Sequence, residues 1–289
     1  MSGLNIFAKL TPLKTRLINI AGKVPAYLLN ALTPSTTYNK TKGQSFGPGA
    51  RDNLDIYRAK TPKADAPVLI FIHGGAWDRG SKGIYKFLAE GFTKSGYDIV
   101  LPNYRLYPDA VFPNFLEDNA KAVAFTAEVF PGRPIVLMGH SAGGYNVLML
   151  ALKDKFLAKF GVNLCETIIG VVSLSAPVGV IPLVGKPLTD IFPNRHAGED
   201  GILNVVSAPT PPFFLAHGED DKIVNPINST LLAEKVIARG GKVQVSIYPG
   251  LSHIGPAQVL SRYFEKKSTL KTDIINFLES LPANGPYCQ

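Results

Sequence analysis

The chain has 289 residues, of which 46% are hydrophobic, and it carries a net charge of +8. This length and apolar content suit one large domain or two small ones with a sizeable core, and they exclude intrinsic disorder. Lys and Arg occur singly along the chain, so the charge pattern gives no indication of nucleic-acid binding. The sequence contains no apolar stretch long enough for a transmembrane helix.

The first 32 residues combine apolar and basic side chains in an amphipathic helical pattern, interrupted by Pro12 and Pro25. They lack the continuous apolar core of a secretory signal. The pattern fits a basic helix on a membrane surface or a cap folded over the functional site, and the proline breaks favour the cap. We therefore predict an N-terminal cap over residues 1–45 and a main domain over residues 46–289.

The chain has two cysteines, Cys165 and Cys288, far apart in the sequence. Two distant cysteines do not make a disulfide framework, and neither lies in a cluster with metal-ligand spacing. This usage predicts two free thiols in a reducing compartment, and hence a cytoplasmic protein.

Beyond a polar, Gly-rich connector over 33–49, apolar runs alternate with helical segments. The first strand is expected to be half-exposed, near a sheet edge, and residues 177–212 read as an irregular insertion. This alternation predicts an α/β fold whose central sheet is mainly parallel, with helices on both faces. Strands are expected over 54–57, 68–72, 97–101, 134–138, 167–174, 213–216 and 243–248, and helices over 80–95, 115–129, 145–152, 226–239 and 271–281.

Gly139-His140-Ser141-Ala142-Gly143 stands between an apolar strand and a helical segment. A strand that turns sharply into a helix at a serine is the setting of a nucleophile elbow, where flanking glycines permit strained backbone angles. The helix N-terminus favours negative charge developing at the serine oxygen. We predict that Ser141 is a nucleophile.

A serine hydroxyl needs a base, usually an imidazole that is itself oriented by a carboxylate. His253 follows the last predicted strand and is the best-placed base. Among the adjacent acids, Asp221 is preferred as the carboxylate and Asp220 is the alternative. Because each of these residues follows a predicted strand, they are expected to meet at one edge of the sheet.

The other four histidines are assigned supporting positions. His73 is expected to hold the shape of the loop His73-Gly74-Gly75-Ala76-Trp77, and His217 to brace the acid loop. His140 is expected to point away from the base, and His196 to lie on the surface of the insertion.

A tetrahedral oxyanion needs backbone N–H donors. The N–H group of Ala142 directly follows the serine, and the loop at His73–Ala76 offers others, because its glycines let the backbone approach closely.

These motifs, together with Asn103-Tyr104-Arg105-Leu106 and His217-Gly218, resemble the α/β-hydrolase carboxylesterases of the hormone-sensitive-lipase-like and bacterial esterase/lipase kind. The loop tryptophan is also similar to that of kynurenine formamidases and isoprenylcysteine methylesterases. The resemblance covers residues 54–281 and implies an α/β-hydrolase fold with a small cap. It also implies an oxyanion hole formed by Gly75, Ala76 and Ala142. Arg105 and Asp118 match positions that hold a neighbouring loop.

The resulting prediction is a serine carboxylesterase for small to medium acyl esters, with Trp77 and Tyr145 lining the pocket or simply packing. No metal or organic cofactor is expected, and a monomer and a dimer are equally open. An arylformamidase acting on N-formylkynurenine would use the same triad. The chain lacks room for the gating domain of an oligopeptidase. A non-catalytic binding protein on the same fold is the alternative from another class, although such proteins usually lose the serine or the histidine.

Overall fold

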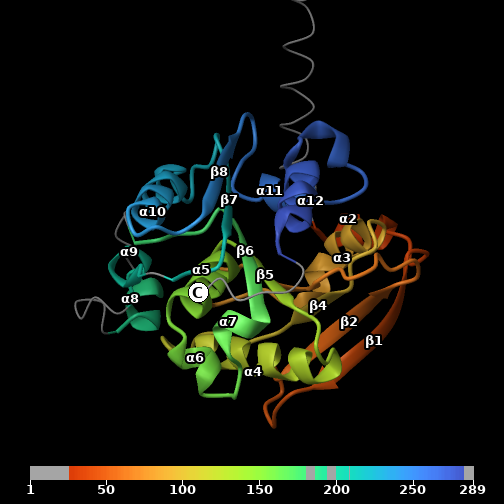
Figure 1. Cartoon of the computed structure of the whole chain (residues 1–289), viewed down its shortest axis with the longest axis horizontal. Helices are drawn as coiled ribbons and strands as arrows, with labels where there is room; N and C mark the ends of the chain where they lie inside the picture. Colours follow the sequence, from red (N-terminus) through yellow and green to blue (C-terminus); the bar gives the residue numbers. More distant parts are fainter. Residues whose placement is uncertain (1–25, 180–185, 194–199, 208, 283–289) are drawn as a thin grey trace, which may run out of the picture.

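The computed structural model describes residues 26–179, 186–193, 200–207 and 209–282. An eight-stranded sheet runs through the molecule in the order β1-β2-β4-β3-β5-β6-β7-β8 (Figure 1). β2 pairs antiparallel with both β1 and β4, whereas the other neighbouring strands are parallel, which confirms the predicted α/β class. The strands are β1 (Tyr38–Ser45), β2 (Asn53–Ala59), β3 (Val68–Ile72), β4 (Ile99–Pro102), β5 (Ile135–His140), β6 (Ile168–Leu174), β7 (Phe213–Gly218) and β8 (Val243–Tyr248).

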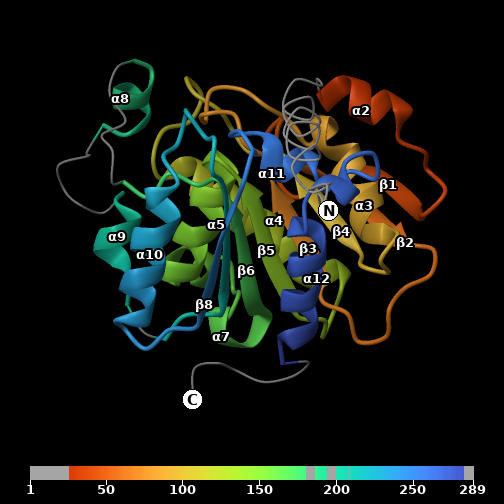
Figure 2. The same cartoon turned by 90° about the horizontal axis from the view of Figure 1, so that it is seen from above.

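Helices cover both faces of this sheet (Figure 2). The α-helices are α2 (Ala26–Leu32), α3 (Lys86–Thr93), α4 (Asn114–Val129), α5 (Ala142–Leu152), α6 (Lys155–Ala158), α7 (Leu164–Thr167), α8 (Leu188–Ile191), α9 (Ile202–Val205), α10 (Ile227–Ile237), α11 (Gly255–Gln258) and α12 (Leu270–Ser280), and short 3₁₀ turns form η2 (Lys82–Tyr85) and η4 (Glu265–Lys267).

The strands of the sheet centre divide their side chains between two apolar cores. In β3, Val68, Ile70 and Ile72 face a core built with α4, α5 and α10. Leu69 and Phe71 face a second core, built with α3 and α12. All five residues are buried. Strands covered on both faces read as continuous apolar runs, and this is why β3, β5 and β6 are easily found in the sequence.

The polar connector predicted over 33–49 is instead largely strand β1. Its register with β2 runs from Tyr38 opposite Ala59 to Ser45 opposite Asn53. Most β1 side chains are exposed, so an edge strand can be built here from polar residues. Because β1 covers the edge, the strand predicted over 54–57 is buried rather than half-exposed. The cap boundary at residue 45 stays a prediction, and residues 1–25 lie outside the described residues.

The insertion over 177–212 contributes α8 and α9 in its described parts. The Phe112 N–H donates to the Ile191 carbonyl at 2.8 Å, which ties α8 to the loop that precedes α4. The Tyr107 hydroxyl donates to Asp190 at 3.3 Å in the same region. Part of the insertion, including His196, lies outside the described residues.

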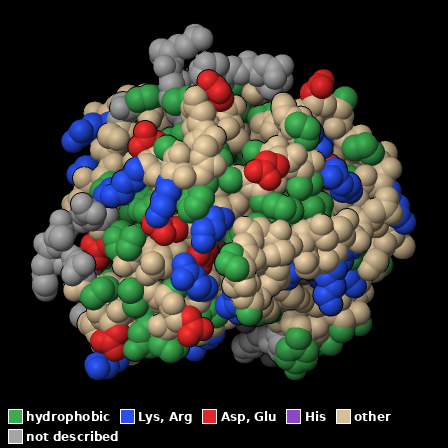
Figure 3. All heavy atoms as spheres, turned by 90° about the horizontal axis from the view of Figure 1, so that it is seen from below, with side chains coloured by type: hydrophobic (Ala, Val, Ile, Leu, Met, Phe, Trp, Pro, Cys, Tyr) green, Lys and Arg blue, Asp and Glu red, His purple; other side chains and the backbone are tan. Residues whose placement is uncertain are grey.

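The remaining expectations from composition have different outcomes. Cys165 is disulfide-bonded, so the prediction of two free thiols is wrong, and Cys288 lies outside the described residues. Charged side chains of both signs are interspersed with apolar ones on the face drawn in Figure 3, in keeping with a thinly spread positive charge. In the part of the chain that the structure describes, the helices are too short or too polar to cross a membrane.

Candidate active site

The Ser141 backbone turns sharply between β5 and α5, with φ 54° and ψ −120°. A positive φ is strained for a residue with a side chain, by about 1–3 kcal/mol, and it persists only where the surroundings enforce it. The Ser141 N–H donates to the Leu174 carbonyl of β6 at 2.8 Å. Gly143 lets the start of α5 approach β3, since a Cβ there would lie 2.0 Å from the Ile72 carbonyl oxygen.

Ser141, His253 and Asp221 form one hydrogen-bonded series. The distance from Ser141 Oγ to His253 Nε2 is 2.9 Å, and that from His253 Nδ1 to Asp221 Oδ2 is 2.7 Å. Because a carboxylate only accepts, Nδ1 carries the proton and Nε2 is left to accept from the serine hydroxyl. Ser141 directly follows β5, Asp221 lies in the loop after β7, and His253 lies in the loop after β8. The three residues are far apart in the sequence, but the parallel strands bring them together.

The Asp221 carboxylate is held by more than the His253 imidazole. The N–H groups of Ile223 and Val224 each donate to its Oδ1 at 2.9 Å. His217 Nε2 lies 3.2 Å from Oδ2 and also 2.9 Å from the Val224 carbonyl, while its Nδ1 meets the Ser229 hydroxyl at 2.8 Å. His217 therefore braces this loop. Burial by itself raises the pKa of Asp221, but hydrogen bonds from His217 and His253 outweigh burial and hold that pKa far below its usual range.

Neighbouring acids do not share this environment. Asp221 is 5% exposed, whereas Glu219 and Asp220 are open to solvent. The Asp220 N–H donates to the Leu251 carbonyl at 3.0 Å, so the backbone of Asp220 serves the loop. Of the two acids weighed from the sequence, it is Asp221 that contacts His253.

The loop His73–Trp77 lies directly against the elbow. A Cβ on Gly74 would lie 2.8 Å from the His140 carbonyl oxygen and 3.2 Å from Ser141 Cβ. Gly75 has φ 126° and Ala76 has φ 49°. Among the described residues, the N–H groups of Gly75, Ala76 and Ala142 have no hydrogen-bond partner.

Three side chains from other parts of the chain hold this loop. The Tyr104 hydroxyl donates to the His73 carbonyl at 3.0 Å, and the Gly74 N–H meets the Tyr85 hydroxyl at 3.4 Å. Arg51 donates to the carbonyls of Tyr104 at 2.6 Å and Gly80 at 2.9 Å. Arg51 could not be predicted from the sequence, because a lone Arg after a Gly-rich stretch carries no motif.

The His73 ring itself is a structural element of the loop, as expected from the sequence. It stacks on the Tyr104 ring with centroids 4.3 Å apart, and its Nδ1 donates to the Gly74 carbonyl at 2.9 Å. Burial lowers the pKa of His73 to about 4, with a further contribution from the Arg51 charge. Its role is therefore that of a neutral, buried ring.

His140 does not point away from the base, which corrects the expectation from the sequence. Its Nε2 lies 2.8 Å from the His253 carbonyl oxygen, and the two rings have centroids 5.1 Å apart. The residue before the serine of an elbow motif carries no signal for such a contact, since its side-chain direction depends on which loop packs beside the strand.

Trp77 and Tyr145 belong to one aromatic cluster with Phe192 of the insertion. Trp77 is 2% exposed, donates to Asn146 Oδ1 at 2.9 Å, and meets the Phe192 ring edge-on at 4.9 Å. Tyr145 packs against Trp77 at 5.3 Å, donates to the Asp200 carbonyl, and faces a cavity of about 130 Å³. Tyr145 thus lines a cavity, whereas Trp77 packs behind it.

The predicted loop-holding pair is present at the entrance to α4. The Arg105 guanidinium contacts both Asp118 oxygens at 2.8 Å, and the Arg105 N–H adds a third bond at 3.0 Å. Such a bidentate pair fixes geometry as well as charge. It holds the segment after β4 in place beside Tyr104.

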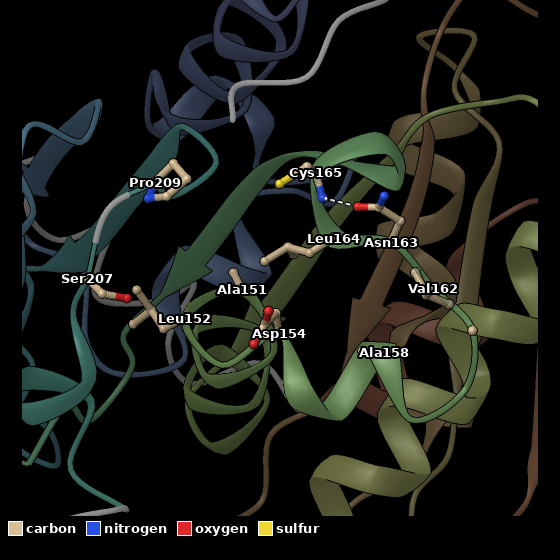
Figure 4. A pocket seen from close by; sticks show the side chains of 11 residues that line it. Ala151, Leu152, Asp154, Ala158, Val162, Asn163, Leu164, Cys165, Ser207 and Pro209 are labelled. Atoms are coloured by element: carbon tan, nitrogen blue, oxygen red, sulfur yellow. Dashed lines mark hydrogen bonds between the residues drawn. The ribbon is translucent and has the colours of Figure 1, made fainter. Parts of the chain in front are cut away.

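A larger cavity, of about 530 Å³, lies at the opposite edge of the sheet from Ser141, where strands β6 and β7 begin (Figure 4). Its walls come from the end of α5 and from the segments that precede β6 and β7, among them Asp154, Asn163 and Cys165. Within the described residues, no three His, Cys, Asp or Glu side chains are grouped to hold a metal ion.

Comparison with known proteins agrees with this fold. The BD-FAE family model matches residues 54–176, which include the glycine loop and the elbow. An esterase B from Lactobacillus rhamnosis, inhibited by a tributyrin phosphonate, superposes with a TM-score of 0.74 at 17% identity, over 96% of each chain. The protein has an α/β-hydrolase fold. The resemblance noted in the sequence is thereby confirmed.

Two curated relatives of this α/β hydrolase are informative. A probable isoprenylcysteine alpha-carbonyl methylesterase of Arabidopsis thaliana is 25% identical over 236 residues, or 72% of this chain and 49% of the relative. Esterase LipQ of Mycobacterium tuberculosis is 30% identical over 212 residues, or 64% of this chain and 50% of the relative. The chain thus spans about half the length of these curated relatives.

Proposed function

We propose that this α/β hydrolase is a serine carboxylesterase that cleaves small to medium acyl esters through an acyl-enzyme. The observation that carries the proposal is the hydrogen-bonded series from Ser141 Oγ to His253 to Asp221, at 2.9 and 2.7 Å. A serine with its base already in hydrogen-bond contact, and a base with its tautomer already fixed, has the arrangement that acyl transfer needs.

In the proposed reaction His253 Nε2 takes the Ser141 proton as Oγ attacks the ester carbonyl. The negative oxygen of the tetrahedral intermediate accepts hydrogen bonds from the N–H groups of Gly75, Ala76 and Ala142, which have no other partner in the part of the chain that the structure describes. His253 returns the proton to the leaving alcohol. Water, deprotonated by His253, then releases the acid from Ser141. Asp221 stays ionised throughout, in line with its strongly lowered pKa.

The proposed substrate range rests on the cavity beside the aromatic cluster of Tyr145 and Phe192. Tyr145 lies one helical turn after the serine and lines the 130 Å³ cavity, a volume that suits a short acyl chain. Trp77 supports Tyr145 from behind. The methyl group of Ala76 leaves less space at this loop for bulky tertiary-alcohol esters.

The test is turnover of p-nitrophenyl esters from acetyl to decanoyl by the wild type and by Ser141→Ala. We expect the highest kcat/KM at short chain lengths and a loss of at least about 10⁴-fold in the variant. No turnover by the wild type, or equal turnover by the variant, would favour a non-catalytic binding protein. The same panel carries N-formylkynurenine, for the arylformamidase alternative, and an isoprenylcysteine methyl ester, because one relative is named for that ester.

A cytoplasmic location is also part of the proposal. The reason given for it by the sequence, two free thiols, does not hold, because Cys165 is in a disulfide. Disulfides persist mainly in oxidising compartments. Fractionation of cells that express the chain, with thiol labelling before and after reduction, decides between the two environments.

A further inference from the structure

We infer that His140 is a positioning residue, whose Nε2–H holds the backbone of the His253 loop so that the His253 imidazole reaches Ser141 and Asp221 together. This inference rests on the proposed function, in which His253 is the base. It assigns a role to a side chain that the reaction itself does not use.

The contact between the two histidines has a defined direction. His140 is the last residue of β5, and its ring is 4% exposed. Its Nε2 lies 2.8 Å from the His253 carbonyl oxygen. Because a carbonyl only accepts, Nε2 must carry the hydrogen. The nucleophile strand therefore donates a hydrogen bond directly to the loop of the base.

The His253 loop needs such a contact because its imidazole has two partners to satisfy. Nδ1 must reach Asp221 while Nε2 reaches Ser141, so a small backbone shift lengthens one bond or the other. On the acid side, the Asp220 N–H holds the Leu251 carbonyl at 3.0 Å. On the nucleophile side, it is His140 that holds the loop. A misplacement of about 1 Å in such a group can cost about 100-fold in rate.

The charge state of His140 suits a donor that stays in place during the reaction. Burial, aided by the neighbouring His253, lowers the pKa of His140 to about 3, and Asp221 and His217 are the other ionisable groups that act on it. A neutral imidazole with hydrogen on Nε2 has a bare Nδ1. That atom has no partner among the described residues and lies against Gly74, whose added Cβ would be 3.0 Å away. No second positive charge therefore opposes the imidazolium that forms on His253.

The experiment compares His140→Gln, His140→Asn and His140→Met. The Gln amide can place an N–H group near the position of Nε2, the Asn amide is one methylene too short, and Met fills the space without a donor. Each variant is assayed for kcat and KM on p-nitrophenyl acetate, for the rate at which a p-nitrophenyl phosphonate modifies Ser141, and for Tm. The phosphonate reports on the serine and its base without deacylation.

We expect Met and Asn to lose about 10- to 100-fold in both kcat and the phosphonylation rate, with KM within about threefold of wild type. Gln should recover to within about fivefold of wild type. Equal rates in Gln and Asn, or wild-type rates in Met, would overturn the inference. The Gln and Asn pair still decides the matter if the Met variant does not fold. A wild type that shows neither turnover nor phosphonylation would instead refute the proposed function, so the two failures are distinct.

Discussion

The two edges of the central sheet carry cavities and polar groups of different kinds. At the edge where β3, β5, β7 and β8 end, the backbone is strained at Ser141 and Ala76, and ionisable side chains are buried. At the opposite edge the cavity is about four times larger, yet Asp154, Asn163 and Ser207 in its walls are exposed, and Asn163 Oδ1 accepts from the Cys165 N–H in its own turn (Figure 4).

This contrast teaches that cavity volume does not locate the chemistry in this molecule. Strain costs free energy, and so does the burial of a charged carboxylate, so both are kept only where the surroundings compensate for them. The Asp221 carboxylate is compensated by hydrogen bonds from Ile223, Val224, His217 and His253, whereas Asp154 at the other edge is exposed to solvent. Variants placed in matched pairs, one at each edge or one buried and one exposed, therefore test whether this difference controls the reaction.

The largest expected effect is at the buried acid. Asp221→Asn should lower kcat by about 10⁴-fold, because an amide favours the wrong His253 tautomer. Asp220→Asn, next in sequence but exposed, should stay within about twofold of wild type. Steady-state kinetics on p-nitrophenyl acetate measure both. A comparable loss in Asp220→Asn would show that the loop, rather than the carboxylate that contacts His253, controls the rate.

The next effect concerns two glycines, one at each edge. Gly74→Ala places a methyl group 2.8 Å from the His140 carbonyl oxygen, so the loop must move away from Ser141. We expect kcat to fall by about 100-fold. Gly161→Ala, which lines the larger cavity, meets no atom within 4 Å but has φ 75°. It should cost about 1 kcal/mol of stability and leave kcat unchanged.

Global unfolding has to be excluded as the cause of any difference in activity between these two glycine variants. Circular dichroism and urea titration of both proteins provide the control. If Gly161→Ala loses as much activity as Gly74→Ala at equal folded fraction, the two edges are coupled and the distinction between them fails.

Much of this edge could be predicted from the sequence because its signals are local. The buried strands are continuous apolar runs, and Ser141 and Asp221 follow two of them, whereas His253 follows the alternating, mostly exposed strand β8. His140, Arg51 and Phe192 were misjudged or missed, because their roles depend on segments 50 or more residues away. Strand β1 was missed for a different reason: its polar sequence becomes a strand only by pairing with β2.

Buried histidines at the site edge should make stability depend on pH. The pKa of His73 is lowered to about 4 and that of His140 to about 3, from 6.5 in the unfolded chain. Each contributes stability that is present above pH 6.5 and is lost as pH falls, since the unfolded chain takes up a proton that the folded protein refuses. Between pH 6.5 and 5 this is about 2 kcal/mol per histidine.

Urea unfolding at pH 7, 6 and 5 measures this loss for the wild type and for His140→Gln. On acidification, the free energy of unfolding should fall less in the variant than in the wild type, because glutamine does not titrate. The difference should equal the contribution of one histidine. An identical pH dependence in the two proteins would mean that His140 is protonated in the folded state, contrary to its burial.

The smallest expected effect is at the opposite edge, in the turn that carries the disulfide-bonded Cys165. Asn163 Oδ1 accepts from the Cys165 N–H at 3.1 Å and caps α7. Asn163→Ala should cost about 0.5–1 kcal/mol in urea unfolding, whereas Asn163→Asp retains the cap and should cost less. Neither should change kcat or KM, because α7 leads into β6 at the end of the strand remote from Ser141. A change in kcat in both variants at unchanged stability would mean that this cavity influences the reaction.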